Sequence, residues 1–401
     1  MKIKKRVFID YSLLLLTIAV SGIPYFTTSI LYVPLFVILF IVFLLRNKKF
    51  NPRFLIFLLL LLFLTFLQSY VFDFYSFNTT IGVLLRVLNG YLIMQILDKK
   101  FLSYFINVIY YIAISSLFIY FSILVVPSVE NILFKLSAIL DVLNISGSTH
   151  KTIIIYNLSK YDQLRNSGPF WEPGAFAGYL MLAYIFNAFI MYKKQKKIAI
   201  LLIVSIATTL STTAYIAMFL FSFFFFYKQI KNIFVKIIVF TMILISAYYA
   251  FFNFEFLGNK ISHQLELAIN VDPYTENTNT QRFLNIMRDM EDLKDHEILG
   301  RGSNPYTRYS YDPENQIRTV GLTDILVRMG IPMFLLILLM MFYSLCAVIH
   351  YYGYKSILYC IGTFVTILIM LMSEVYFNFP LYWSLLFLSL VYKKPKKERL
   401  R

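Results

Sequence analysis

The chain contains little charge and very little cysteine. Only 14% of its 401 residues are charged, 59% are hydrophobic, and there are two Cys and four His. So few cysteines support neither a disulfide framework nor a Cys-based metal site. No Asp-x-Asp pair is present to hold a metal, and no internal repeat is evident, which counts against transporters built from repeats. A soluble globular domain is excluded by the mean hydropathy of +0.70.

Long apolar runs recur from one end of the chain to the other, and each is long enough to predict a helix that crosses or enters a bilayer. The sequence therefore predicts an all-α polytopic membrane protein, one integral membrane domain over 1–401, with about 12 transmembrane helices. The predicted spans are 8–23, 29–45, 54–72, 79–97, 101–126, 174–192, 198–210, 213–227, 235–253, 321–348, 356–374 and 376–392.

The net charge of +16 does not indicate nucleic acid, because most Lys and Arg fall in short clusters between apolar runs. Basic clusters follow every second span, as the positive-inside rule requires of cytoplasmic loops. Both termini are then inside, and the long polar segments 127–173 and 254–320 are large external loops. The rule also favours reading 198–227 as a hairpin broken near Thr208–Thr213 rather than as one helix. The first span lacks a cleavage site and is read as a retained helix.

One external stretch combines a cation, a carboxylate and a helix start. Arg165 precedes Gly168, Trp171 and Glu172, and Pro173 suits the first turn of the following apolar helix. Glu172 would lie beside the unpaired N–H groups at the positive end of the helix dipole, so the stretch is a candidate anion-handling site. The simpler interpretation is an ordinary helix cap with an Arg at the membrane surface.

The second external segment offers further arginines. Apolar and charged residues alternate at helical spacing from Arg282 to Asp292, which predicts an amphipathic helix at the membrane surface. Gly300-x-Gly302 follows, and alone it most often marks a helix stop. Arg308 and Arg318 come next, either as ligand contacts or as solvated loop charges. Asp324 and Arg328 are four residues apart, a spacing that favours a local ion pair at a helix start.

Other ionisable residues are weaker candidates. Arg86 falls in the middle of an apolar span, where a lone cation is a functional hypothesis by default; the alternative is a polar neighbour inside the bundle. His150, His263 and His296 lie in the external segments and are candidate bases, although nothing nearby suggests a partner for His263 or His296.

The run Arg165, Gly168, Phe170, Glu172 and Pro173 resembles the signature of bacterial O-antigen and capsule repeat-unit polymerases (Wzy type), relatives of the O-antigen ligases. The Arg-led helix followed by Gly300-x-Gly302 is similar to the same superfamily. Thr209-x-Ser211 matches a Thr-x-Ser-Arg turn of the relatives, but Thr212 stands in place of the Arg. Ligases place a His-Asn pair where this chain has Thr319-Val320, so the resemblance is to polymerases rather than ligases.

The resemblance implies a GT-C-like glycosyltransferase of the bacterial cytoplasmic (inner) membrane that needs no cofactor. Its substrate would be an undecaprenyl-diphosphate-linked oligosaccharide, polymerised into O-antigen, capsular or exopolysaccharide of the cell envelope. Membrane lipids, a chain-length regulator and a flippase are the implied partners, with no nucleic acid. Arg forks suit the leaving diphosphate. The implied catalytic residues are Arg165, Glu172 and Arg318. The implied substrate-binding residues are Arg282, Arg308, Gly168, Trp171 and Arg86.

Three alternatives stay open. An O-antigen ligase would transfer finished glycan to a lipid acceptor or a protein. A polysaccharide flippase or other transporter would place charges inside its spans, around a cavity, whereas here they concentrate in two external loops. A sensor would need a soluble signalling domain on the inside. Glu172 itself is either a general base on the attacking hydroxyl or the residue that orients Arg165 and caps its helix.

Overall fold

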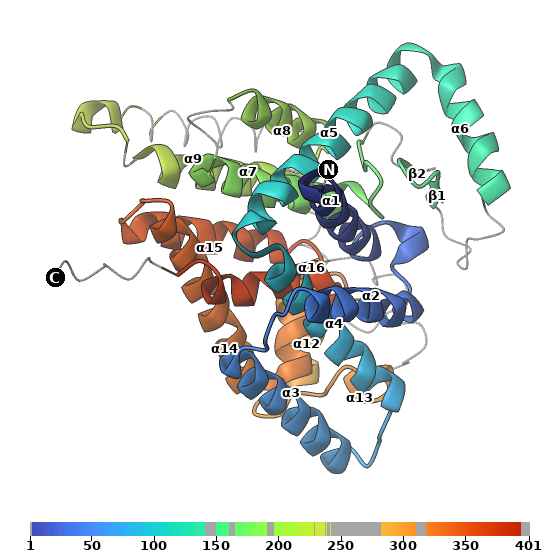
Figure 1. Ribbon diagram of the computed structural model, residues 1–401, viewed down its shortest axis with the longest axis vertical. Helices are drawn as coiled ribbons and strands as arrows, with labels where there is room; N and C mark the ends of the chain where they lie inside the picture. Colours follow the sequence, from blue (N-terminus) through green and yellow to red (C-terminus); the bar gives the residue numbers. More distant parts are fainter. Residues whose placement is uncertain are drawn as a thin grey trace.

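The computed structural model shows a bundle of helices with a small β-hairpin at its edge (Figure 1). The structure describes residues 2–140, 150–159, 165–190, 196–227, 229–236, 238, 241, 282–309 and 318–393. Apolar helices dominate these ranges, because a helix satisfies its own backbone hydrogen bonds and so tolerates a lipid environment.

The helices of the first part of the chain are α1 (Lys2–Val20), α2 (Tyr32–Leu45), α3 (Pro52–Val71), α4 (Phe77–Leu97), α5 (Phe101–Val125), α6 (Pro127–Leu140), α7 (Pro173–Ile190), α8 (Lys196–Thr208) and α9 (Thr212–Tyr227). Those of the second part are α12 (Arg282–Leu293), α13 (Pro305–Arg308), α14 (Gly321–Tyr351), α15 (Ile357–Leu371) and α16 (Pro380–Trp383). Strands β1 (His150–Thr152) and β2 (Asn157–Ser159) pair antiparallel, with Lys151 opposite Leu158.

The chain is an all-α membrane protein by length and composition of its helices. Four helical stretches of the described residues are long and apolar enough to cross a membrane: Pro52–Val71, Phe77–Val125, Pro173–Ile190 and Gly321–Tyr351. Shorter apolar helices lie at Ser29–Leu45, Thr212–Tyr227, Ile357–Leu371 and Pro380–Leu390. Most of the predicted spans therefore fall on helices, whereas nearly all of span 235–253 lies outside the described residues. The last predicted span is not one straight helix. It is divided into η6 (Tyr376–Asn378), α16 and η7 (Ser384–Leu390), with Pro380 at the start of α16.

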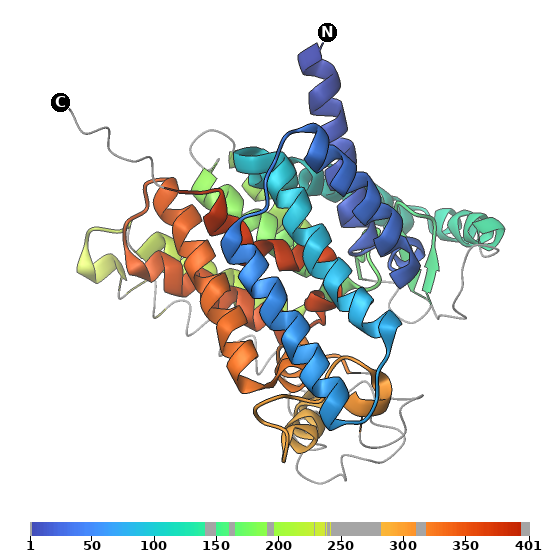
Figure 2. The same ribbon diagram turned by 60° about the horizontal axis from the view of Figure 1, so that its bottom comes forward.

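Basic residues from several inter-helix connections gather at one end of the bundle. Arg46, just after α2, contacts Asp10 of α1 at 2.5 Å, and Lys48 contacts Asp98 at 3.2 Å at the end of α4. Lys99 lies over the ring of Tyr351, which ends α14. The opposite end holds the start of α4, where the Asn304 amide donates to Thr79 Oγ1 at 3.3 Å. In Figure 2 this second end carries α12 and α13 and lies away from the first turn of α1. The ends of α2, α4 and α14 thus lie at one end of the bundle, and the start of α4 lies at the other.

The predicted break in 198–227 is present. The first helix ends at Thr208, Leu210 has φ +47°, and the second helix begins at Thr212. Thr208 accepts from the Asn166 backbone near the start of α7, whereas Phe225 packs its ring against Phe189 near the end of α7. Helices α8 and α9 therefore lie along α7 in opposite directions, and the turn between them lies near the start of α7.

Helix α14 is interrupted at Gly330, which has φ +69°. The freed backbone groups are taken up by residues 297–302: Ile331 N donates to Glu297 O at 2.7 Å, and Arg301 N donates to Val327 O at 2.7 Å. A Cβ on Gly330 would lie 2.2 Å from Ile298 O, so only glycine fits there. The Gly300-x-Gly302 motif, predicted as a helix stop, thus fills the interruption of α14, next to Asp324 and Arg328.

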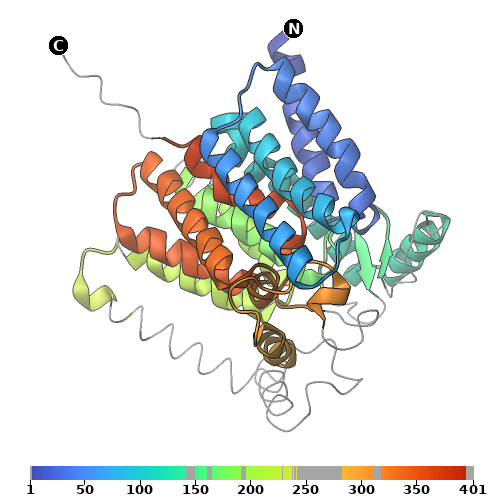
Figure 3. The ribbon, with the colours of Figure 1, turned by 90° about the horizontal axis from the view of Figure 1, so that it is seen from below.

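Helix α7 forms the centre of the bundle, because almost all of its residues are buried. Its first turns are closely packed: Tyr376 Oη donates to Gly174 O at 3.0 Å, and a Cβ on Gly178 would lie 1.8 Å from that hydroxyl. Helix α14 packs on η7, which in turn contacts α4 (Figure 3). The Tyr376 contacts hold segment 374–376 against the start of α7, directly after Glu172.

Candidate functional site

The two segments that the sequence predicts to be external meet at Glu374, which lies between α15 and η6. From the first segment, Trp171 Nε1 donates to Glu374 Oε2 at 3.3 Å. From the second, Arg282 Nη2 contacts Glu374 Oε1 at 3.5 Å. Glu374 is 3% exposed, so its carboxyl group lies at the inner wall of the meeting point. Both segments thus contact the same carboxyl group, as a shared site requires.

The turn between α8 and α9 contacts two of the candidate arginines, Arg165 and Arg282. Arg165 Nε donates to Thr209 O at 3.1 Å, and Arg282 Nη1 lies 3.5 Å from Thr213 Oγ1. Thr212, which lies between Thr209 and Thr213 in this turn, stands where the Thr-x-Ser-Arg turn of the similar family has its Arg. Arg282 from α12 reaches the same turn from a distant part of the chain, so a guanidinium group is present there after all.

A second carboxylate lies beside Glu374. A Cβ placed on Gly174 would be 2.6 Å from Glu374 Oε1 and 3.6 Å from Glu172 Oε1, so Gly174 separates two closely spaced acidic groups. Burial raises the pKa of Glu374 well above its ordinary 4.5, and the negative charge of Glu172 raises it further; Arg282 and the Trp171 N–H only partly oppose the rise.

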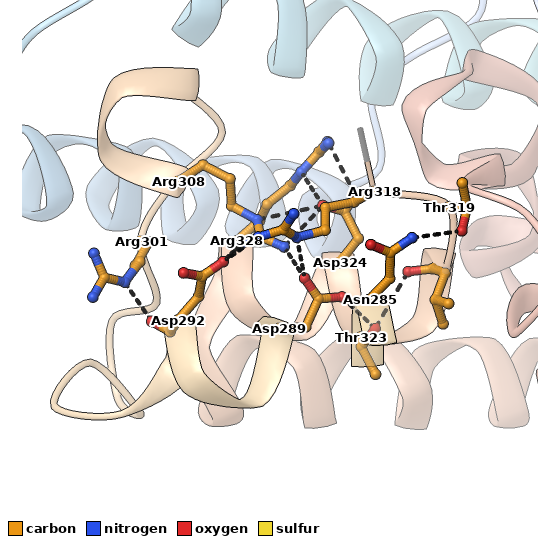
Figure 4. A network of polar contacts seen from close by, with 11 residues as sticks. Asn285, Asp289, Asp292, Arg301, Arg308, Arg318, Thr319, Thr323, Asp324 and Arg328 are labelled. Atoms are coloured by element: carbon orange, nitrogen blue, oxygen red, sulfur yellow. Dashed lines mark hydrogen bonds and ion pairs between the residues drawn. The ribbon is translucent and has the colours of Figure 1, made fainter. Parts of the chain in front are cut away.

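Arg308 and Arg318 occupy a different environment, a buried ion-pair network (Figure 4). Arg308 is 1% exposed and contacts Asp289 at 2.5 Å, Asp292 at 2.8 Å and Asp324 at 3.3 Å. Arg318 contacts the same Asp289 and Asp292 at 3.1 and 2.9 Å. Burial lowers the pKa of Arg308, but the three carboxylates raise it by more, and the guanidinium stays charged.

The network is completed at the start of α14. The predicted ion pair between Asp324 and Arg328 is present, with Nη2 and Oδ2 2.9 Å apart. Arg328 also donates to Asn378, and Thr323 donates to Asp289. Among the described contacts, three arginines thus face three aspartates, and these contacts attach α12 and α13 to the start of α14.

Helix α12 forms where the amphipathic pattern predicts it. Its buried face carries charge, including Arg288, Asp289 and Asp292, while Phe283 and Met287 are 36% and 42% exposed. Arg308 and Arg318 supply partners for the buried carboxylates of Asp289 and Asp292.

The remaining candidates are placed as follows. Gly168 is buried with φ +51°, and its N–H donates to Asn166 Oδ1 at 2.9 Å, which indicates a turn that orients Trp171 and Glu172. The Arg86 guanidinium lies 5.7 Å from the centre of the Tyr32 ring, and its Nε has no hydrogen-bond partner among the described residues. Arg86 and Gly168 thus stay predictions as substrate contacts. Of the candidate bases, His150 lies on β1, His296 stacks near Phe72, and His263 lies outside the described residues.

Sequence reasoning missed Glu374 and the aspartates of α12. Glu374 stands at the end of an apolar span in Met372-Ser-Glu-Val-Tyr376, and a lone acid at such a position is a signal worth following. Asp289 and Asp292 look like the solvated face of a surface helix until their partners are known. Among the described residues, no three His, Cys, Asp or Glu side chains are arranged to hold a metal ion.

The fold and the site define a helical membrane protein with two neighbouring carboxyl groups, one of them buried, and two arginines at one end of its bundle. Comparison with protein-family models, with curated proteins and with solved structures finds no match to this chain.

Proposed function

We propose that the protein is a glycosyltransferase that polymerises polyprenyl-diphosphate-linked oligosaccharide repeat units on the outer face of a bacterial cytoplasmic membrane. In this proposal the chain crosses the membrane about 12 times, in a GT-C-like arrangement with both termini cytoplasmic. The end of the bundle that carries Glu172, Arg282 and Glu374 faces outward, opposite the basic clusters around Arg46 and Lys99.

The reaction needs a cation for the leaving group and a base for the nucleophile. A sugar hydroxyl of one lipid-linked unit attacks the anomeric carbon of the growing glycan. The bond between that carbon and the diphosphate oxygen breaks, and its electron pair leaves with the lipid diphosphate. Arg165 and Arg282 stabilise the departing negative charge, and Glu172 accepts the hydroxyl proton.

The observation that carries the proposal is the loose attachment of Arg282. Its contacts with Glu374 and Thr213 are both 3.5 Å long, at the limit of hydrogen bonding, and 29% of its side chain is exposed. Arg308, in contrast, is enclosed by three carboxylates. Arg282 can therefore turn to a diphosphate without leaving a buried anion unpaired, whereas Arg308 and Arg318 cannot. We assign those two to the support of the site.

Alanine substitutions in cells that make the lipid-linked glycan test the proposal. Arg165→Ala and Arg282→Ala should each leave single lipid-linked units accumulating and long chains absent, while the protein still inserts. Arg165→Lys should also be impaired, because an ammonium group lacks the guanidinium fork. Arg53→Ala is the matched control: Arg53 is exposed at the opposite end of the bundle, and chain lengths should stay normal. Normal chains in Arg282→Ala would remove Arg282 from the mechanism.

The carboxyl pair favours a second candidate, a proton-coupled flippase for the same lipid-linked sugar. Buried ionisable groups within membrane proteins mark proton relays as well as catalytic sites. Liposomes with the purified protein distinguish the two functions. A polymerase lengthens glycans without any pH gradient, whereas a flippase moves unchanged single units and responds to the gradient.

A further inference from the structure

The carboxyl groups of Glu172 and Glu374 form an arrangement to which the sequence assigned no role. They converge on Gly174 from opposite directions along the chain, since Glu172 precedes α7 and Glu374 follows α15. A Cβ at position 174 would displace the Glu374 carboxyl group from its place, because it would lie 2.6 Å from Oε1. The close packing of Tyr376 on α7 holds the second carboxyl group in place.

Two ionised carboxylates at this spacing would be unfavourable. Glu374 is 3% exposed, and its polar contacts are the Trp171 N–H and a long contact to Arg282. When like charges share a site, one group keeps a proton. The buried member retains it, and the more exposed member, Glu172, carries the charge. Among the described residues, the other charged or titratable groups that face Glu374 are Arg282 from α12, Tyr376 from η6 and Tyr382 from α16.

We propose that Glu172 and Glu374 share one proton, and that Glu374 is a positioning residue that holds the Glu172 carboxylate toward the acceptor hydroxyl. The proposal rests on the proposed function and deepens it. During transfer the hydroxyl proton passes to Glu172 as the new bond between oxygen and the anomeric carbon forms. Glu172 then releases this proton to water, while Glu374 keeps its own.

The shared proton also sets the charge of the site. With one proton on the pair, only one of its two carboxyl groups is negative. With both carboxylates ionised, the site would carry one more negative charge and the attraction for a diphosphate would fall. The site should consequently bind a lipid diphosphate well only while the pair retains its proton.

Infrared spectroscopy of the full-length protein in phosphatidylcholine nanodiscs tests the shared proton. The wild type should show the C=O stretch of a protonated carboxyl group at neutral pH, and Glu374→Gln should lose it. In Glu172→Gln the same band should disappear at lower pH than in the wild type, since the repelling charge is gone. Glu291→Gln is the control: Glu291 lies on exposed α12 surface beside Lys294, and the band should be unchanged. A wild type without the band, or a Glu374→Gln variant that keeps it, overturns the inference.

Binding of undecaprenyl diphosphate to the same nanodiscs separates this inference from the proposed function. Wild-type binding should weaken as the pH rises and the pair loses its proton. Glu374→Gln should retain binding at high pH, because its side chain is neutral throughout. An unchanged pH profile in Glu374→Gln overturns the inference even when the lipid binds. Absence of binding at every pH, with the carboxyl band present, refutes the proposed function and leaves the shared proton standing. If Glu374→Gln does not fold, the band shift in Glu172→Gln decides.

Discussion

Replacement of Arg308 by Met measures how much the buried network holds the second external segment in place. Met keeps much of the length of the Arg side chain but removes three ion pairs, to Asp289, Asp292 and Asp324. Arg308 is 1% exposed, so water does not replace the lost partner. Breaking a buried pair from one side costs about 3–5 kcal/mol. We expect a loss of that size in the free energy of unfolding.

Unfolding of the purified protein in mixed micelles, followed by tryptophan fluorescence, gives the measurement. Lys294→Met is the matched control, since Lys294 and Glu291 form an exposed pair at the end of α12 with 65% and 51% of their side chains accessible. Such pairs contribute about 1 kcal/mol or less. Adding Asp289→Asn to Arg308→Met restores equal numbers of opposite charges and should recover part of the loss.

The pH dependence of the free energy of unfolding provides a further check on the Arg308→Met prediction. Burial raises the pKa of Asp289, and Arg308 opposes that rise, so Arg308→Met should raise this pKa further. A carboxyl group with a raised folded-state pKa stabilises the fold at low pH and loses this contribution as the pH rises. The defect of Arg308→Met should therefore shrink on acidification. Equal, small losses in Arg308→Met and Lys294→Met would refute the reasoning that buried charge secures this segment.

Three further predictions concern the backbone, the carboxyl pair and the topology. Gly330→Ala should destabilise the protein by a few kcal/mol in thermal unfolding, because position 330 combines φ +69° with a close contact to Ile298 O. In the same measurement the control Gly82→Ala should be neutral or stabilising, because there is open space around Gly82 in α4. Glu374→Gln should gain stability over the wild type as the pH rises above 4.5, since the raised pKa of Glu374 makes its ionisation costly in the folded state; equal Tm values across pH would contradict this. The topology can be tested in a background with Cys346 and Cys360 replaced by Ser. A Cys introduced at exposed Lys135 or Tyr306 should react with an impermeant reagent added from outside, and a Cys at Lys355 should not. Labelling of positions 135 and 306 from opposite sides of the membrane would rule out a shared external site.

Composition and periodicity determine the class of protein and the positions of most helices. Apolar runs as long as Pro52–Val71 form helices because unpaired backbone groups are costly in lipid, whatever the tertiary contacts. The basic clusters predict the alternation of helix direction and the break at Thr208–Thr212, since each is a local property of the loops. The Asp324–Arg328 pair was likewise predictable from a spacing of four.

Tertiary structure alone decided which charged residues form the site and which support it. Arg282, Arg308 and Arg318 look alike in the sequence, and only their partners distinguish them: Glu374 at 3.5 Å for the first, and Asp289 with Asp292 for the other two. Those partners come from segments far apart in the chain, and no local pattern encodes the pairing. Glu374 gained its role in the same way, because the packing of Tyr376 on α7 brings it within reach of Glu172 across Gly174. Burial and neighbouring charge set the chemistry of an ionisable side chain, and both are properties of the folded bundle.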